Sequence, residues 1–398
     1  MSMRTKPSFA LVWWLSLAQL ITWGSSFYGF ALFMGPMEQH LHLTRSESSL
    51  AFSLALLCEG LMAFVVGRWI DKGYAKQVMT WGSVCVGLAF LVHRWVDSSF
   101  AFYALWMLIG AGWSATLYNP AFTVLTQHYP HDFRRAIITM TFLGGLASTV
   151  FIPLVAFLES SLGWRDALTV LAVLNLLICV PLHAWILKEI QPPSHHASNQ
   201  NSKQSLQQHL KQAPFWLLGA FIVLMMAATS AIPPHMVSLL RESGMNNAWA
   251  IAVPASIGVL QVLGRLVLYF LNDRVPVHQA NRWVPWLIPS AFAMLLIGYG
   301  QHSFAIAFVV LYGVGNGLLT IVKGTSMAEY VSREHNGALN GILGIPLALS
   351  RALSPWLLGL LWQQEIGYRY GLMLMVCVCT VAIVCMLLAQ KISLQKNL

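Results

Sequence analysis

Long apolar stretches, separated by short polar connections, run through nearly the whole of this 398-residue chain. Hydrophobic residues make up 57% of the sequence, whereas Asp, Glu, Lys and Arg together make up 9%, against about 25% in an ordinary globular protein. So few charged side chains cannot cover a soluble protein of this length, and most of its surface must therefore face lipid. We expect an all-α membrane protein, because a helix satisfies its own backbone hydrogen bonds inside a bilayer.

The apolar stretches predict twelve transmembrane helices. A helix rises about 1.5 Å per residue, so roughly 20 apolar residues cross the hydrocarbon core of a membrane. Stretches of sufficient length occupy residues 9–34, 47–66, 77–95, 100–124, 135–158, 166–187, 213–237, 248–270, 283–300, 303–326, 337–361 and 367–389.

The Lys and Arg residues predict the orientation of these helices. An even number of spans places both termini on one side, and cytoplasmic connections are enriched in Lys and Arg. Most of the 23 basic residues fall on the side of the termini. The opposite side holds Arg45, Arg94, Arg165, Arg241 and Arg369, while Arg351 lies within a span. We therefore expect both termini in the cytoplasm, and a multi-pass protein of a bacterial inner (plasma) membrane.

A polar segment divides the chain into two expected halves. Residues 188–212 are rich in Gln, Ser, Asn and His and contain two prolines, which is typical of a flexible linker. This segment predicts an N-terminal six-helix half at 1–187, a cytoplasmic linker at 188–212 and a C-terminal six-helix half at 213–398. The histidines of the linker lack the fixed spacing of metal ligands.

An internal repeat supports this division. Gly67-Arg68, followed by Asp71-Lys72, corresponds to Gly264-Arg265, followed by Asp273-Arg274. Gly163-Trp164-Arg165 in the first half likewise corresponds to Gly367-Tyr368-Arg369 in the second. Because matching spans have the same orientation, the repeat predicts two halves related by a pseudo-two-fold axis along the membrane normal.

Several classes of function are disfavoured by the sequence. The net charge of +9 is spread over short connections, so we expect no nucleic-acid partner. The chain has no phosphate-binding loop, and its six cysteines all lie inside apolar stretches without metal-ligand spacing. We therefore expect no cofactor, no metal and no enzymatic activity. A membrane receptor or scaffold stays open as an alternative.

The connection between the second and third spans resembles a motif of the major facilitator superfamily of secondary transporters. It runs Gly67-Arg68-Trp69-Ile70-Asp71-Lys72-Gly73, one residue shorter than the family pattern before the last glycine. The resemblance covers the whole chain and implies alternating access, in which two halves rock around a central site. It also implies an inner gate, to which we assign the motif and its repeat: Gly67, Asp71, Lys72, Arg265 and Asp273.

A finer resemblance is to the monocarboxylate-porter branch of that superfamily. The run from Ser26 to Pro36 and the start of the second span at Glu47-Ser48-Ser49 are similar to that branch. Gln261 stands where the branch often has an aspartate used in proton coupling. Glutamine cannot carry a proton, so a coupling residue must be sought elsewhere.

Two charged residues within the predicted spans are candidates for coupling. A charge at membrane depth costs at least about 2.5 kcal/mol on insertion scales, so it is a functional candidate by default. Glu59 lies inside the second span and Arg351 near the middle of the eleventh. We expect Glu59 to carry a proton and Arg351 to modulate it. The alternative is a static structural pair.

The superfamily resemblance implies that the first, fourth, seventh and tenth spans line a central cavity. Polar residues at helical spacing in these spans, together with neighbouring aromatics, are the expected substrate-binding set: Gln19, Trp23, Tyr28, Tyr118, Asn119, His235 and Asn316. Small polar residues also serve helix packing, so each stripe has this second interpretation. Pro233-Pro234, directly before His235, predicts a broken seventh helix with this histidine at an aqueous mouth or a gate.

We therefore expect a monomeric secondary active transporter that moves a small organic solute in exchange or symport with protons. An aromatic and polar cavity with little negative charge favours an organic anion or a neutral metabolite. A drug-efflux antiporter and an uncoupled facilitator are the alternatives.

Overall fold

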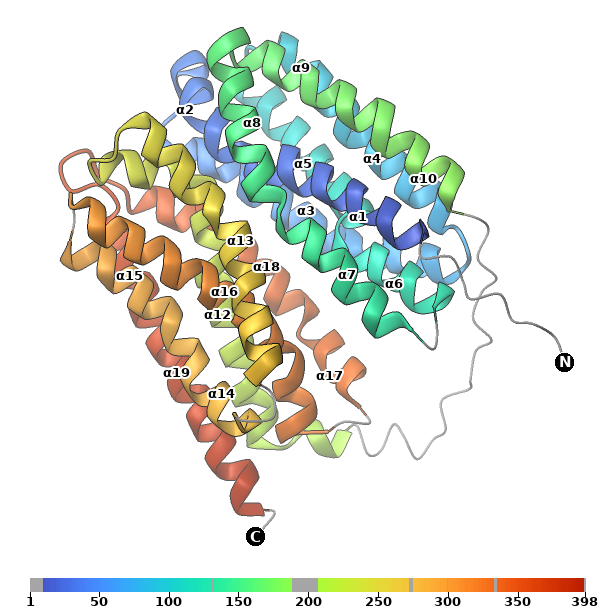
Figure 1. The fold of residues 1–398 in the computed structure, drawn as a ribbon, viewed down its shortest axis with the longest axis vertical. Helices are drawn as coiled ribbons and strands as arrows, with labels where there is room; N and C mark the ends of the chain where they lie inside the picture. Colours follow the sequence, from blue (N-terminus) through green and yellow to red (C-terminus); the bar gives the residue numbers. More distant parts are fainter. Residues whose placement is uncertain are drawn as a thin grey trace, which may run out of the picture. The chain divides into compact units, whose positions relative to one another are not determined.

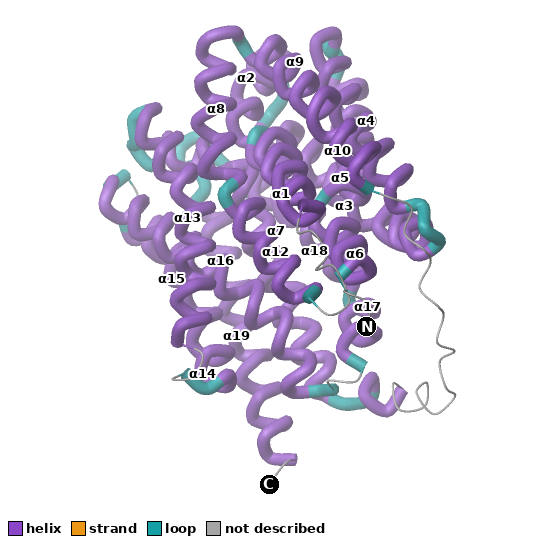
Figure 2. The backbone as a smooth tube through the Cα atoms, turned by 45° about the vertical axis from the view of Figure 1, so that its right-hand side comes forward, coloured by secondary structure: helices purple, strands orange, loops and turns teal. Residues whose placement is uncertain are grey.

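The computed structural model describes residues 10–129, 132–187, 207–271, 275–298, 300–332 and 335–396. Helices joined by short connections make up nearly all of this described part, as Figure 2 shows. Most of the predicted linker, at 188–206, and the predicted gate residue Asp273 lie outside the described residues.

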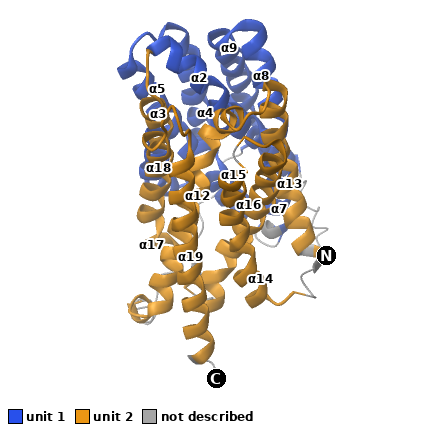
Figure 3. Cartoon of the chain, turned by 90° about the vertical axis from the view of Figure 1, so that its left-hand side faces the viewer, with its two compact units in different colours: residues 1–41, 54–194 blue, residues 42–53, 195–398 orange. Residues whose placement is uncertain are grey.

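The chain forms two compact units, coloured separately in Figure 3. Unit 1 comprises residues 1–41 and 54–194, and unit 2 comprises residues 42–53 and 195–398. Helix α3 (Arg45–Asp71) therefore begins in unit 2 and continues in unit 1. The division of the chain into halves at 188–212 stays a prediction.

Unit 1 is a bundle whose helices are labelled in Figure 1. Besides α3 it contains α1 (Ala10–Thr22), a π-helix η1 (Trp23–Tyr28), α2 (Phe30–Leu41), α4 (Ala75–Val92), η2 (His93–Trp95), α5 (Ser99–Thr116), α6 (Tyr118–His128), α7 (Phe133–Gly145), α8 (Ala147–Leu162), α9 (Trp164–Leu174), a second π-helix η3 (Asn175–Cys179) and α10 (Val180–Ile186).

Unit 2 combines long helices, of 25 to 30 residues in α12, α13, α16 and α19, with shorter ones. They are α12 (Ala213–Glu242), α13 (Asn247–Leu271), α14 (Val277–Trp283), η4 (Val284–Trp286), α15 (Leu287–Ile297), α16 (His302–Tyr330), α17 (Asn336–Ile342), α18 (Gly344–Leu360) and α19 (Arg369–Lys396).

Within the described residues, nine helical stretches are long and apolar enough to cross a membrane. They are Arg45–Asp71, Ala75–Trp95, Ser99–His128, Arg135–Leu162, Trp164–Ile186, Ala213–Glu242, Asn247–Leu268, His302–Tyr330 and Arg369–Gln395. The other three expected spans contain helices that are interrupted, by η1 in the first, by η4 in the ninth and at Leu343 in the eleventh. The count of twelve therefore stays a prediction.

Glycines allow close contact between neighbouring helices in both units. A methyl group at Gly110 of α5 would overlap the backbone of Ala55 in α3, and one at Gly317 of α16 would overlap that of Gln261 in α13. Gly112 of α5 and Gly313 of α16 also pack closely, on Val86 and Leu260 respectively. These two glycines therefore serve helix packing, as small residues commonly do between membrane helices.

Helix α12 is not broken at Pro233-Pro234, so this prediction was wrong. The helix is continuous from Ala213 to Glu242. Pro233 has no N–H, which leaves the carbonyl of Thr229 without its helical partner. The hydroxyl of Tyr312 in α16 donates to that carbonyl at 2.7 Å. A neighbouring helix thus supplies the hydrogen bond that proline removes, as membrane helices require.

Candidate functional site

A break between α5 and α6 fixes the position of two predicted site residues, Tyr118 and Asn119. Leu117 is extended, with φ −76° and ψ −163°, so α5 ends at Thr116 and α6 begins at Tyr118. Pro120 cannot donate to the carbonyl of Thr116. Gln19 of α1 donates to that carbonyl instead, at 2.6 Å. Gln19, itself a predicted site residue, therefore stabilises the helix break that positions Tyr118 and Asn119.

Gln19 also holds Trp23, the next predicted residue. The indole Nε1 of Trp23 donates to Oε1 of Gln19 at 3.1 Å. The Gln19 side chain is fully buried, whereas Trp23 is partly exposed. Gln19 therefore connects the helix break to an aromatic side chain at the edge of unit 1.

Trp23 is the centre of an aromatic cluster in unit 1. Its ring centroid lies 4.7 Å from that of Phe27, 6.4 Å from that of Tyr28 and 5.1 Å from that of Tyr118. Tyr118 in turn stacks on Phe122 at 5.4 Å. Tyr28 and Tyr118 are partly exposed and Asn119 is exposed. We call Trp23, Tyr28, Tyr118 and Asn119 the aromatic face; it contains aromatic and amide groups and no charged side chain.

His235 occupies a closed position in unit 2. Its side chain is 0% exposed, and Nε2 donates to the carbonyl of Pro355 at 2.9 Å. Nδ1 lies 3.0 Å from the hydroxyl of Tyr368, which in turn accepts from Arg45 Nη1 at 2.7 Å. In the neutral ring, Nδ1 accepts the hydroxyl proton, so both ring nitrogens and the hydroxyl of Tyr368 have partners. Within unit 2, His235 connects α12, α18 and the start of α3.

Arg45 lies at the centre of this arrangement. Its Nη1 is 3.5 Å from Oε1 of Glu242, and its guanidinium carbon lies 5.0 Å from the ring centroid of Trp362. Trp362 Nε1 donates to the second oxygen of Glu242 at 2.8 Å. Arginine combines bidentate donation with stacking on aromatic rings, which explains why it suits this position. We call Arg45, His235, Glu242, Trp362 and Tyr368 the Arg45 network.

The predicted coupling residues lie in different units. Glu59 is buried, 7% exposed, in the unit 1 part of α3. Arg351 is half-buried in α18 of unit 2, and the predicted substrate residue Asn316 is half-buried in α16. Their roles stay predictions.

The predicted gate motif forms the end of α3. Gly67 has open space around its Cα, and Asp71 and Lys72 are exposed. Gly73 has φ 92°, and the N–H groups of Gly73 and Tyr74 bond back to Ile70 and Trp69. This is a Schellman C-cap, which requires a left-handed residue and so favours glycine.

The matching gate position in unit 2 is described in part. Arg265 of α13 is half-buried and its Nε donates to the carbonyl of Gly317 in α16 at 3.4 Å. Asp273 lies outside the described residues.

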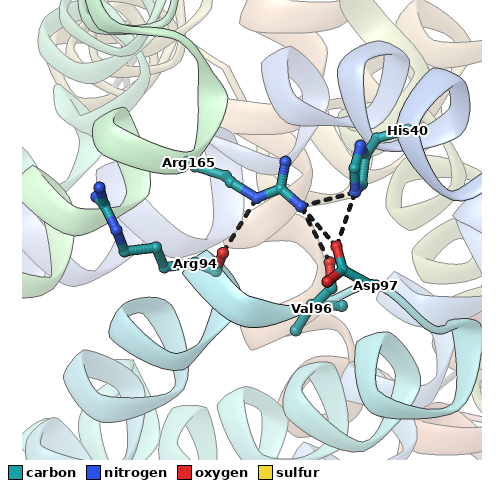
Figure 4. A network of polar contacts seen from close by, with 5 residues as sticks. All are labelled: His40, Arg94, Val96, Asp97 and Arg165. Carbon is teal, nitrogen blue, oxygen red and sulfur yellow. Dashed lines mark hydrogen bonds and ion pairs between the residues drawn. The ribbon is translucent and has the colours of Figure 1, made fainter.

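A third polar network, shown in Figure 4, joins three connections at one end of unit 1. Arg165 Nη2 lies 2.8 Å from Oδ1 of Asp97 and 2.6 Å from Nε2 of His40, and that same Nε2 lies 3.1 Å from Oδ1 of Asp97. Arg165 Nε donates to the carbonyl of Arg94, whose side chain pairs with Asp166. The network ties together the end of α2, the residues of and just after η2, and the start of α9.

Sequence reasoning missed most members of these networks. The repeat motif identified Arg165 and Tyr368, and the orientation argument listed Arg45 as one of few basic residues on its side. No sequence signal connects Arg45 to Glu242 or to Trp362, because these partners lie far away in the chain. Asn175, which contacts η1, lies in an apolar stretch without a motif around it.

The sequence of this chain is similar to those of a known protein family and of individual transporters. Residues 15–297 match the model of the Major Facilitator Superfamily. An uncharacterized MFS-type transporter, YcxA, of Bacillus subtilis (strain 168) is 25% identical over 374 residues, covering 88% of this chain and 87% of that protein. Monocarboxylate transporter 12-B of Danio rerio is 21% identical, covering 81% and 75% respectively.

Solved structures share the fold. A bacterial homolog of the human lysosomal transporter Spinster, in an inward-facing and unoccupied conformation, has a TM-score of 0.76 at 15% identity, covering 98% of both chains. The nucleoside transporter NupG has a TM-score of 0.73 at 14% identity, covering 96% of this chain and 99% of that one.

Replacing Tyr368 with Phe tests the Arg45 network. The change removes the hydroxyl that Arg45 and His235 share, and leaving a buried polar group unmatched costs about 1–3 kcal/mol. We expect a lower unfolding temperature in detergent, by about 2–4 °C for each kcal/mol in a domain of 150–250 residues. The matched control is Tyr370→Phe, because Tyr370 is 50% exposed. Equal unfolding temperatures for the two variants would contradict this expectation.

Proposed function

Because this chain belongs to the Major Facilitator Superfamily, we propose that it is a secondary active transporter that moves a small organic solute by alternating access. As an integral, multi-pass membrane protein with transporter relatives, it has the helices that such a cycle needs. The observation that carries the proposal at the level of the site is the aromatic face, on which uncharged polar groups lie beside partly exposed rings. Transport without chemical conversion requires no catalytic group, so the proposal implies no enzymatic activity.

The aromatic face would bind the solute through Trp23, Tyr28, Tyr118 and Asn119, with Gln19 orienting Trp23. Rings supply apolar contact, and the indole, hydroxyl and amide groups supply a few directed hydrogen bonds. Asn316, in unit 2, stays a proposed substrate-binding residue. His235 is buried with protein partners on both nitrogens, so we do not propose that it contacts the solute.

The favoured solute is a small organic anion, in particular a monocarboxylate, or a neutral metabolite. The aromatic face offers no fixed negative charge that would attract a multivalent cation. Relatives of this chain bear the name monocarboxylate transporter, and one protein of the same fold transports nucleosides. Efflux of hydrophobic drugs is the alternative within the same family.

A thermal-shift screen with purified protein distinguishes these solutes. A ligand present at 100 times its dissociation constant stabilises the folded state by about 2.7 kcal/mol. We expect lactate or another monocarboxylate to raise the unfolding temperature, and uridine and succinate serve as neutral and dicarboxylate comparisons. Stabilisation by rhodamine dyes alone would instead support drug efflux.

Protons would drive transport through Glu59. A carboxyl group that is dry in one state and wet in the other binds protons differently in the two states, which couples protonation to the conformational change. Arg351 would modulate this proton, and the exposed Asp71 would stabilise one state of the inner gate. Uncoupled facilitation is the alternative, with Glu59 as a structural partner.

The variant Glu59→Gln separates coupled from uncoupled transport. Glutamine keeps the shape of the side chain but cannot bind a proton, so we expect lactate exchange in proteoliposomes to continue while accumulation against a gradient is lost. Glu159→Gln, at the end of α8 in the same unit, is the matched control and should accumulate normally. Full accumulation by Glu59→Gln under an imposed pH gradient would exclude Glu59 as the carrier.

The orientation would place both termini in the cytoplasm of a bacterial cell, with the protein acting as a monomer. In a variant whose six cysteines are replaced, Asn247→Cys should react with an impermeant maleimide added outside intact cells. Gln208→Cys should react only after the membrane is opened, because the predicted orientation places it in the cytoplasm. Both positions are exposed in the structure, so each can react once the reagent reaches it. The reverse pattern of labelling would invert the orientation.

A further inference from the structure

Two π-helical turns lie against each other inside unit 1. π-helices account for well under 1% of residues in proteins, and they are frequent at functional sites. In η1 the N–H of Gly29 bonds to the carbonyl of Gly24, and in η3 the N–H of Val180 bonds to that of Asn175, so both turns have the wide i to i+5 spacing. Their coincidence in one bundle needs a physical cause.

Side chains connect the two turns at both ends. Asn175 at the start of η3 donates from Nδ2 to the hydroxyl of Ser25 in η1 at 3.0 Å. Thr22, the residue before η1, lies 3.9 Å from the sulfur of Cys179 at the end of η3. All four side chains are buried, with exposures of 0 or 1%. The two turns are therefore held as a pair.

The wide turn of η1 is held from other sides as well. The hydroxyl of Ser26 donates to the carbonyl of Thr22 and accepts from Trp113 Nε1 of α5, at 2.7 Å for the latter. Gly24 leaves space for Phe151 of α8, whose ring a methyl group would overlap. Among these contacts, the hydrogen bond from Asn175 to Ser25 is the one that joins a side chain of η3 to a side chain of η1.

The π-turn decides which side chains of the first span share a face. In an α-helix of 3.6 residues per turn, positions 23 and 28 would point about 140° apart. In a π-turn, residues five apart are the hydrogen-bonded neighbours and lie above one another. Trp23 and Tyr28 accordingly have ring centroids 6.4 Å apart. The π-turn therefore accounts for the contact between Trp23 and Tyr28 within the aromatic face.

We propose that Asn175 is a positioning residue for the transport site, which keeps η1 in its π form through Ser25 and thereby holds Trp23 and Tyr28 on one face. Asn175 itself is buried and does not belong to the aromatic face. The Asn175 amide lowers the stability of the folded state, because its Oδ1 is buried and has no hydrogen-bond partner among the described residues. An unmatched buried acceptor costs about 1–3 kcal/mol, so it calls for a compensating role. The proposal rests on the proposed function for its link to a solute.

The first arm of the test measures geometry without any solute. In a protein with its six cysteines replaced, Tyr28→Cys reports the exposure of position 28 through its reaction rate with N-ethylmaleimide. We expect Asn175→Ala to change this rate about tenfold, the effect of losing about 1.4 kcal/mol of preference for the π form. Asn175→Ala also removes the bond from Nδ2 to the carbonyl of Leu171, at 2.9 Å, whereas Ser25→Ala removes only the bond between the two π-helices. Ser25→Ala should therefore give the same change in rate, and the double variant no further change, if the shared bond is the one that matters.

A matched control separates this effect from general loss of stability. Ser83 of α4 and His183 of α10 form another buried pair in unit 1, at 2.9 Å, that includes no residue of η1. Ser83→Ala should lower the unfolding temperature as Asn175→Ala does, yet leave the labelling of position 28 unchanged. The exchanged pair Ser25→Asn with Asn175→Ser conserves total volume and should restore the labelling rate.

The second arm measures lactate uptake into proteoliposomes with Tyr28 intact. We expect Asn175→Ala to raise KM about tenfold with little change in the maximal rate, and the exchanged pair to restore KM. An unchanged labelling rate overturns the proposal whether or not lactate is transported. A changed labelling rate with an unchanged KM also overturns it, because the turn would then not position a solute site. If wild-type protein takes up no lactate, the proposed solute fails while the labelling arm still decides the role of Asn175.

Discussion

Inside a membrane every backbone carbonyl needs a partner within the protein, and this constraint explains the polar contacts that organise both units. Pro120 and Pro233 each remove the N–H that would serve the carbonyl four residues earlier. Gln19 supplies the missing donor to Thr116, and Tyr312 supplies it to Thr229. Both carbonyls lack the donor that proline removes, yet the backbone differs. The helical backbone breaks at Leu117, between α5 and α6, whereas α12 remains continuous.

The difference between these outcomes shows what could be predicted from the sequence. Composition and apolar length predict a helical membrane protein, and the repeated Gly-Trp/Tyr-Arg motif identifies two matching corners, where Gly163 and Gly367 have positive φ values of 79° and 58°. The prolines themselves are visible in the sequence. Whether a proline breaks a helix depends on a donor from another helix, and the donor to Thr229 lies 83 positions away.

The candidate site was predictable to a similar extent. Gln19, Trp23, Tyr28 and Tyr118 were identified by polar and aromatic spacing, and the structure brings them together in unit 1. His235 was expected at an aqueous mouth, yet Pro355 and Tyr368, more than a hundred residues further on, enclose it. The π-turn that aligns Trp23 with Tyr28 depends on Asn175, Trp113 and Phe151, and local sequence around η1 contains none of them. Long-range contacts of this kind leave no periodic pattern.

The fold leaves the solute undetermined, because proteins of this architecture transport chemically different molecules. Structures of similar fold share 14 or 15% of their residues with this chain. Discrimination between solutes therefore depends on a small number of side chains. In unit 1, the uncharged aromatic face is where differences in these side chains would change the choice of solute. An interrupted first span suits this purpose, since a wide turn brings together residues that a regular helix would separate.

In the network of Figure 4, one imidazole ring lies between an arginine and an aspartate of unit 1. A single nitrogen, Nε2 of His40, lies within hydrogen-bonding distance of a donor on Arg165 and an acceptor on Asp97. With a lone pair it can serve only the arginine, and with a proton only the aspartate. The charges of the two arginines and two aspartates balance here, and the tautomer of one ring decides whether the end of α2 bonds to the start of α9 or to Asp97, just after η2.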